Sequence, residues 1–343
     1  MSNLGLSVPV LQTLMHKFGE LARLADDAGF RSLWDYESYR NPFLLHAITA
    51  AATKRILLGT GIAQAFIRSP FEAANAAADV DELSAGRVIL GIGPGGPDWL
   101  EAFHSTDAAN AIFRMSEFVD VVRMTWDYFS GGAREGAAYA GTYYKFTAPQ
   151  INPWGPRELA RPRIPIYLSA MRPRMLQLAG GKADGTLGYL HTPEFSRDHV
   201  KPNLIKGARK AGRDPMSIDY ASLIVCSVSN DRAEAIHRAR VQVGIYVAVA
   251  ISDVIVQFHG CQADQAAIRE AIAKGGTEAI EAATSDRLVE LFAIAGTPDE
   301  ARKQATRYRE SIPHVVLHPP YAPLLPADAT EDAFRNIVAA FGD

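Results

Sequence analysis

Three side chains that could take part in catalysis follow a strand-like run near the start of the chain. The run covers residues 31–36, and the side chains are Trp34, Glu37 and Ser38. A carboxylate can accept or donate a proton, a hydroxyl can hydrogen-bond a substrate, and an indole offers a flat apolar face. At the carboxyl end of a barrel strand, such groups face the active site. We predict catalytic roles for all three; the alternative is that Trp34 is a core aromatic and Glu37 a solvated carboxylate.

A glycine-rich stretch follows the strand-like run at 87–92. Residues 91–96 read GIGPGG and match G-x-G-x-x-G, the phosphate-binding pattern of nicotinamide enzymes. That pattern needs a helix to begin at once, whereas Pro94 and Pro97 interrupt it and helical periodicity returns only near Ala111. We interpret the stretch, which includes Gly93, as a loop at the mouth of a barrel where backbone passes close to a ligand. A nicotinamide dehydrogenase on an open sheet is the alternative.

His314 and His318 have the spacing that paired metal ligands have on a helix. They fall in a strand-like run, where alternation places both on one face, and the neighbouring sequence offers no carboxylate. We predict no metal site and interpret both as core or rim histidines. Cys226 and Cys261 match no zinc or catalytic signature, and the sequence contains no G-x-S-x-G elbow, so nucleophilic hydrolysis has little support.

The composition excludes several classes of partner. The 343 residues carry a formal net charge of −3, so no basic field attracts nucleic acid or anionic lipid. The longest apolar run, 245–251, is too short to span a bilayer, and the first residues lack the basic and apolar regions of a signal peptide. We expect a cytoplasmic protein that acts on a small molecule, without nucleic acid or membrane as a partner.

Short apolar runs alternate with amphipathic helical stretches along the whole chain. Helices begin at two capping signals with a proline at the first helical position, Ser69–Glu72 and Thr297–Glu300. A hairpin at 139–149 and helices up to about residue 291 are insertions. The pattern predicts one α/β domain over residues 1–343, a (β/α)8 TIM barrel with insertions. Its eight strands are predicted at residues 4–10, 31–36, 55–62, 87–92, 164–169, 185–189, 218–229 and 314–318.

Several segments together resemble the luciferase-like monooxygenase superfamily over essentially the whole chain. The most specific runs from residues 68–70 (RSP) through 81–87 (DELSAGR) to 90–93 (LGIG). The Gly-Ile pair at 61–62 and the GIGPG segment are similar to the coenzyme F420-dependent branch that includes methylenetetrahydromethanopterin reductase. The remaining segments, in chain order, are 25–34, 55–62, 165–170, 183–185 and 295–300.

The resemblance implies a barrel, usually dimeric, that binds reduced FMN or the deazaflavin coenzyme F420 at the carboxyl ends of its strands. It implies a non-proline cis peptide between Gly61 and Ile62, pressed against the cofactor ring. A phosphate of the cofactor tail would meet the amino end of the helix that follows residues 169–172. Tyr189 and His191 are candidates to line the tail or the substrate pocket. The predicted cofactor contacts are Gly61, Ile62, Gly93, Ser169, Ala170, Met171, Arg172 and Gly188.

We expect coenzyme F420 rather than FMN because of the similarity to this branch. The protein would then be an oxidoreductase that transfers a hydride between the deazaflavin and a small organic substrate. With FMN it would be an oxygen-using monooxygenase served by a partner flavin reductase. A non-catalytic flavin-binding protein is the third possibility.

Two positions depart from related deazaflavin dehydrogenases. Ser38 follows Glu37 where several relatives have a histidine, and Gly96 stands where some have a glutamate. The nearest acids to Gly96 are Asp98 and Glu101, so Glu37 is the first candidate acid or base. We also expect a homodimer, from the resemblance, and a hydrophobic substrate, from the aromatic residues Trp34, Phe66, Trp99 and Phe103.

Overall fold

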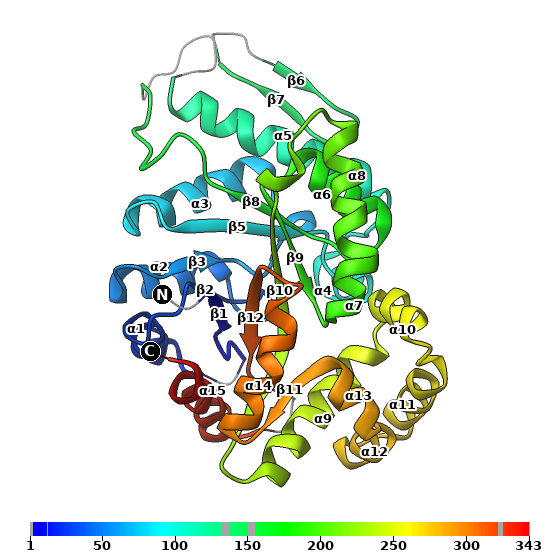
Figure 1. The fold of residues 1–343 in the computed structure, drawn as a ribbon. Coiled ribbons are helices and arrows are strands. Elements are labelled where there is room, and N and C mark those ends of the chain that lie inside the picture. Colours follow the sequence, from blue (N-terminus) through cyan, green and yellow to red (C-terminus); the bar gives the residue numbers. More distant parts are fainter. Residues whose placement is uncertain (1–2, 12, 132–137, 150–154, 322–324, 343) are drawn as a thin grey trace.

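The computed structural model describes residues 3–11, 13–131, 138–149, 155–321 and 325–342. Within these residues, eight parallel strands pair in a closed ring (Figure 1). The predicted (β/α)8 barrel is confirmed, and because the sheet closes, the open-sheet alternative is excluded. Around the ring the strands are β1 (Leu4–Ser7), β2 (Ser32–Trp34), β3 (Leu57–Gly59), β5 (Val88–Gly93), β8 (Ile166–Ser169), β9 (Gly185–Tyr189), β10 (Asp219–Val228) and β12 (His314–His318), which pairs with β1.

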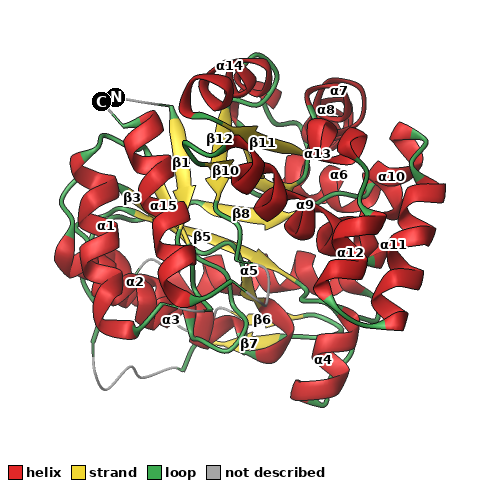
Figure 2. Cartoon of the chain, turned by 90° about the horizontal axis from the view of Figure 1, so that it is seen from below, coloured by secondary structure: helices red, strands yellow, loops and turns green. Residues whose placement is uncertain are grey.

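Helices cover the outside of the barrel. Both predicted capping signals are present: the Ser69 hydroxyl accepts from the amide of Glu72 at 3.0 Å, and Thr297 and Glu300 form the reciprocal box. The last helix lies beside the first, where Arg335 pairs with Glu20 at 2.6 Å (Figures 1 and 2). The helices between and around the strands are α1 (Phe18–Asp27), α2 (Pro42–Ala52), α3 (Pro70–Leu83), α5 (Ala111–Phe129), α6 (Pro173–Lys182), α8 (Lys201–Lys210), α9 (Arg232–Ala248), α14 (Pro298–Arg309) and α15 (Ala327–Phe341).

Insertions extend the barrel on two sides. The predicted hairpin is present as β6 (Ala138–Ala140) and β7 (Lys145–Thr147), which packs on α5 (Figure 1). The helices α10 (Asp253–His259), α11 (Gln262–Lys274), α12 (Thr277–Ala283) and α13 (Asp286–Phe292) gather beside α9 and lead into β11 (Ala293–Gly296), which pairs with β10. The remaining short elements are η1 (Met15–Lys17), β4 (Ala63–Gln64), η2 (Ala65–Ile67), α7 (Pro193–Phe195), η3 (Ser196–Val200), η4 (Pro215–Ser217) and η5 (Ala250–Ser252).

One helix contradicts the prediction from sequence. α4 (Pro97–His104) begins soon after β5, where the prolines led us to expect a loop as far as Ala111. Pro97 occupies the first helical position, where the missing N–H would have had no partner within the helix. The same proline that we interpreted as an interruption therefore starts a helix.

An apolar layer fills the barrel interior. Trp34 is fully buried in this layer. A Cβ atom added to Gly59 would lie 2.4 Å from the indole, so the neighbouring strand needs a glycine there. Side chains alternate along a strand, so a residue two positions after a member of this layer faces the same side of its strand. Such residues form the next layer toward the carboxyl end of the barrel. The apolar layer consists of Trp34, Ile89, Tyr167, Leu187, Ala221, Leu223 and Val316.

Taken singly, none of the helices in the described residues is both long enough and apolar enough to cross a membrane. Arg232–Ala248 and Ala250–His259 meet the length and composition criteria only as a pair, and that pair is bent by 82°.

Candidate functional site

Polar and aromatic side chains form the layer above the apolar one. On β12, Val316 faces the interior while Val315 and Leu317 face the helices, so His314 and His318 share the interior face. The same alternation on the other strands gives a layer at the carboxyl end of the barrel. This is the end at which barrels of this kind hold their active sites. Its members include Ser7, Tyr36, Gly93, Ser169, Tyr189 and His318.

On one side of this mouth, the backbone at Gly93 lies close to the side chains of Ile62 and Ser169. The peptide between Gly61 and Ile62 is cis, as the resemblance implied. Ile62 packs on the apolar layer below. A Cβ atom at Gly93 would lie 2.6 Å from Ile62 Cδ1 and 2.9 Å from Ser169 Cβ, so only glycine fits without displacing both neighbours. We call Gly61, Ile62 and Gly93 the glycine ledge.

Glu37 is held in a buried ion pair beside the ledge. Its carboxylate accepts hydrogen bonds from Arg68 at 2.6 and 2.7 Å and from the Gln64 amide at 2.7 Å. The two side chains are only 7% and 8% exposed. Burial lowers the pKa of Arg68, but the hydrogen bonds and charge of Glu37 outweigh it and hold that pKa above its ordinary value. Both carboxylate oxygens thus accept hydrogen bonds within the protein, and the pair joins the loop after β2 to the segment after β3. A role of Glu37 as acid or base remains a prediction.

Replacing Glu37 tests this structural role. We expect Glu37→Gln to lower the free energy of unfolding by about 2 kcal/mol, because a buried guanidinium loses its charged acceptor. The matched control is Glu72→Gln: Glu72 contacts the same guanidinium at 3.1 Å, but its side chain is 49% exposed. We expect that control to cost less than about 0.5 kcal/mol. Urea unfolding measures both. Unchanged stability of Glu37→Gln together with lost turnover would contradict this structural role and support Glu37 as the acid or base.

The other two predicted catalytic residues have different positions. Trp34 is fully buried, and its indole N–H donates to the Ser32 hydroxyl at 2.7 Å, so the core interpretation replaces the catalytic one. It supports the mouth from beneath. Ser38 follows Glu37, and its hydroxyl oxygen is buried without a hydrogen-bond partner among the described residues. A direct role for Ser38 remains a prediction.

The predicted tail-binding segment is divided between the core and the surface. Ala170 and Met171 are each 4% exposed, and their side chains pack in the main hydrophobic core. Arg172 is exposed at the amino end of α6 and donates to the Ala250 carbonyl at 3.2 Å. Ser169 and Arg172 therefore keep their predicted positions next to a helix amino end.

Gly188 is a correction. Its neighbours Leu187 and Tyr189 face the barrel interior, so position 188 faces the surrounding helices. A Cβ atom there would lie 2.0 Å from the His191 ring. The imidazole of His191 is itself fully buried and lies 2.9 Å from the Tyr220 hydroxyl. Gly188 therefore serves packing behind β9. His191 Nε2 is buried without a partner among the described residues, so a ligand contact of His191 remains a prediction.

Aromatic side chains form a lip outside the site. The Trp99 ring lies 4.4 Å from Phe103 and 5.3 Å from Tyr39 between ring centroids. Phe103 and Tyr39 are 61% and 76% exposed. Phe66, in contrast, is buried under Arg114, which lies 3.7 Å above its ring. Two of the four predicted aromatic residues, Trp99 and Phe103, thus lie together on an accessible surface.

Sequence reasoning missed the most polar part of the mouth. Tyr246 Oη lies 3.0 Å from His318 Nε2 and 2.7 Å from Tyr321 Oη. The Tyr36 ring stacks on Tyr321 at 5.0 Å and meets His318 edge-on at 5.7 Å. The one signal in the sequence was the shared face of His314 and His318, which we interpreted only as core or rim. We call Tyr36, Tyr246, His318 and Tyr321 the tyrosine–histidine cluster.

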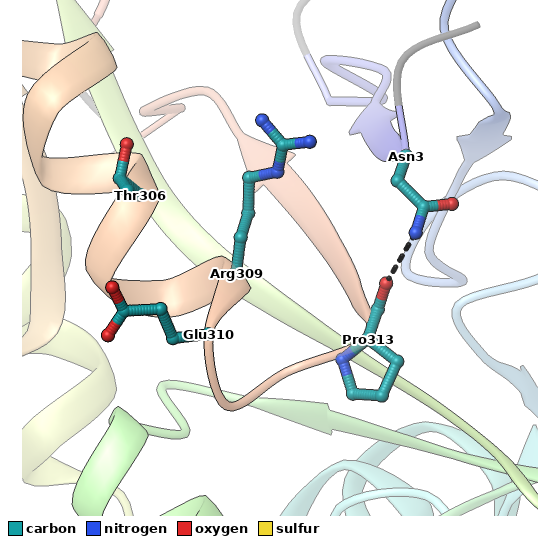
Figure 3. A pocket seen from close by; sticks show the side chains of 5 residues that line it. All are labelled: Asn3, Thr306, Arg309, Glu310 and Pro313. Carbon is teal, nitrogen blue, oxygen red and sulfur yellow. Dashed lines mark hydrogen bonds between the residues drawn. The ribbon is translucent and has the colours of Figure 1, made fainter.

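Among the described residues, no cluster of side chains forms a metal site, and an open pocket lies away from the mouth. The described residues contain no group of three or more His, Cys, Asp or Glu side chains that could hold a metal ion. An open pocket of about 310 Å³ lies at the opposite, amino end of β1 and β12, where Asn3 donates to the Pro313 carbonyl at 3.3 Å (Figure 3). It is lined by Asn3, Thr306, Arg309, Glu310 and Pro313 and is separated from the mouth by the filled barrel.

Comparison with known proteins agrees with this geometry. The family model described as luciferase-like monooxygenase matches residues 8–314. The 5,10-methylenetetrahydromethanopterin reductases of Methanolobus tindarius and Methanopyrus kandleri are 30% and 31% identical over 320 and 327 residues, which covers 90% of this chain and 91% and 90% of theirs. The expected similarity to these reductases is confirmed.

Two solved structures share the architecture over nearly their whole length. The coenzyme F420-dependent tetrahydromethanopterin reductase of Methanopyrus kandleri superimposes with a TM-score of 0.81 at 26% identity, covering 98% of this chain and 99% of that one. An F420-dependent secondary alcohol dehydrogenase has a TM-score of 0.75 at 21% identity and covers 99% of both chains, which shows the shared fold. The family model and the relatives lead to one conclusion: the chain belongs to the luciferase-like monooxygenase family.

Proposed function

We propose that this protein is a coenzyme F420-dependent oxidoreductase that transfers a hydride between the deazaflavin and a small organic substrate. The glycine ledge is the observation that carries the proposal, because it offers an apolar surface to a flat ring at the carboxyl end of the barrel. The relatives support the choice of cofactor: the reductase and the dehydrogenase with matching folds are both described as F420-dependent.

The mouth also has the polar atoms that a deazaflavin would need. Buried oxygen and nitrogen atoms need hydrogen bonds, and their absence marks a place for a ligand or water. At this mouth the Ser7 and Ser38 hydroxyls and Gln64 Oε1 are such atoms, since none of them has a partner among the described residues. They come from the ends of β1 and β2 and from β4 beside the ledge. The residues present therefore fit a ring that is apolar on one face and polar at its edge.

Each part of the mouth has a task in this proposal. Ile62 packs against the ring, and Gly93 leaves the space that a side chain would fill. The amino end of α6 with Ser169 and Arg172 holds a phosphate of the tail. When bound, the deazaflavin supplies a two-electron hydride carrier, while the protein positions the ring and shields the reacting face from water.

A titration with two cofactors tests the proposal. Purified protein is titrated with coenzyme F420 and separately with FMN, and fluorescence quenching reports binding. We expect micromolar or tighter binding of F420 and much weaker binding of FMN. The reverse preference would overturn the proposal in favour of an oxygen-using monooxygenase. F420 binding without hydride transfer to any acceptor would indicate a binding protein rather than an enzyme.

We further propose that the protein is a homodimer that acts on a hydrophobic small molecule. The lip, in which Tyr39 and Phe103 are exposed beside a half-buried Trp99, supports an apolar substrate. Light scattering coupled to gel filtration measures the mass of the particle against the 37.2 kDa of one chain. The cytoplasmic location stays a prediction from sequence.

A further inference from the structure

The tyrosine–histidine cluster lies in the layer that faces the mouth. His318 is two residues beyond Val316 on the interior face of β12, and Tyr36 is two residues beyond Trp34 on the neighbouring side of the barrel. The centroids of the Tyr36 and His318 rings are 5.7 Å apart, and the rings meet edge to face. Tyr246 comes from α9 and Tyr321 from the segment after β12, so three separate parts of the chain converge on one imidazole.

Only one nitrogen of this imidazole is occupied within the described residues. Nε2 lies 3.0 Å from the Tyr246 hydroxyl, whereas Nδ1 is buried without a partner. The His318 side chain is 1% exposed. A buried ring nitrogen without a hydrogen bond is costly, so this atom is a strong candidate to meet a ligand.

Burial keeps the members of the cluster neutral. It lowers the pKa of His318 to about 3 and raises the pKa of both Tyr246 and Tyr321. A neutral imidazole carries its proton on one nitrogen, and the hydrogen bond of the other nitrogen decides which. If Tyr246 donates to Nε2, then Nδ1 carries a proton that it can donate; if Nε2–H donates to Tyr246, then Nδ1 is an acceptor. The Tyr246 and Tyr321 hydroxyls lie 2.7 Å apart, so the hydrogen-bonded series runs from His318 through Tyr246 to Tyr321.

We propose that His318 Nδ1 hydrogen-bonds the carbonyl oxygen of an aromatic aldehyde or ketone and exchanges a proton with it through the Tyr246–Tyr321 chain. The inference rests on the proposed hydride-transfer function. In reduction, the carbonyl carbon would gain a hydride that the reduced deazaflavin supplies, the electron pair of the C=O π bond moves to oxygen, and that oxygen takes the Nδ1 proton. Nε2 then takes the Tyr246 proton, Tyr246 takes the Tyr321 proton, and half-buried Tyr321 is reprotonated from solvent. The rings of Tyr36 and Tyr321 favour a flat substrate.

The first test needs neither cofactor nor substrate. In protein labelled with ¹⁵N-histidine, the His318 signals are assigned by their loss in His318→Gln, and their shifts report the tautomer. We expect a single neutral tautomer at neutral pH and a changed tautomer ratio in Tyr246→Phe, because the partner of Nε2 is lost. A tautomer that is insensitive to Tyr246→Phe, or a His318 that is charged at neutral pH, would overturn the relay.

The second test uses reduced F420 with benzaldehyde and acetophenone as probes. We expect His318→Gln to lower kcat/KM about 100-fold and Tyr246→Phe about tenfold, the range of general acid–base catalysis. The F420 dissociation constant should change less than about threefold in each, or less than about 0.7 kcal/mol. Tyr308→Phe is the matched control, because it removes a buried hydroxyl that donates to the Leu291 carbonyl away from the mouth, and it should retain wild-type kinetics.

The two proposals fail in different ways. Absence of F420 binding in the wild-type protein would contradict the proposed function. Normal F420 binding with wild-type kinetics in His318→Gln would overturn only the relay. Normal F420 binding without reduction of either probe by the wild-type protein would overturn the assigned substrate class.

Discussion

Acidification from pH 7 to pH 5 is expected to destabilise the protein by about 2 kcal/mol for each fully buried neutral histidine. Burial lowers the pKa of His191 and of His318 to about 3, and the nearby charge of His199 also lowers that of His191. Burial likewise lowers the pKa of His314. An unfolded chain protonates these side chains below about pH 6.5, whereas the native protein does not.

The direction of the effect follows from proton uptake. Between pH 6.5 and 3 the unfolded state binds more protons, so stability rises with pH across this window and is lost on acidification. Asp35 and His46, which lie 3.4 Å apart, act in the opposite sense. Burial raises the pKa of Asp35; burial lowers the pKa of His46, but the charge of Asp35 outweighs it and holds that pKa above its usual value. The native state therefore takes up these protons earlier than the unfolded chain. The two groups offset at most two of the three neutral histidines, and the net result remains a loss of stability in acid.

Urea unfolding at pH 7, 6 and 5 measures this dependence. We expect His191→Gln to reduce the slope of stability against pH by the contribution of one proton, about 1.4 kcal/mol per pH unit at most. His16→Gln is the control, because His16 is exposed, and its slope should equal that of the wild type. Equal stability of the wild-type protein at pH 7 and pH 5 would show that these imidazoles are hydrated rather than buried neutral.

Gly93→Ala is expected to weaken F420 binding about 100-fold, or by about 2.7 kcal/mol. The added Cβ atom would lie 2.6 Å from Ile62 Cδ1 and 2.9 Å from Ser169 Cβ. Either the flexible end of Ile62 moves into the space proposed for the ring, or the backbone at Ser169 shifts away from the tail site. Both changes remove a surface that the ligand uses, while the barrel beneath is unaffected.

The matched control for this variant lies in the same loop. A Cβ atom at Gly96 would meet only Trp99 Cβ at 3.8 Å, an ordinary contact, and Gly96 has a φ of −72° that any residue can adopt. We expect Gly96→Ala to bind F420 with wild-type affinity in the same fluorescence titration. Wild-type affinity in Gly93→Ala as well would place the ring away from the glycine ledge and would remove the observation on which the proposed function rests.

The positions of these groups explain how the protein can be stable and still bind a ligand. Trp34 and the rest of the apolar layer fill the barrel, so the mouth above needs no apolar packing of its own. The buried pair of Glu37 and Arg68 then fixes the loop next to the ledge. Unpaired polar atoms, such as Ser38 Oγ and His318 Nδ1, are left over at the mouth, where a ligand can satisfy them.

The sequence by itself determined the architecture and the local signals. The alternation of short apolar runs with amphipathic helical stretches predicted the eight barrel strands, because the burial of each element is visible in its own sequence. The capping serine and threonine at Ser69 and Thr297 depend on partners three residues away, so they were readable without the fold. The cis peptide at Gly61–Ile62 and the family were readable from motifs of neighbouring residues.

Only the tertiary structure decided which polar groups are occupied and which are free. Glu37 and Arg68 are 31 positions apart, and Tyr246 and His318 are 72 positions apart, so no local pattern shows that they are partners. Gly188 was misjudged because its role depends on the face of β9 that it occupies and on the ring of His191. The physical reason is the same in each case: periodicity encodes the burial of one element, whereas the charge state and hydrogen bonds of a side chain depend on the elements that fold against it.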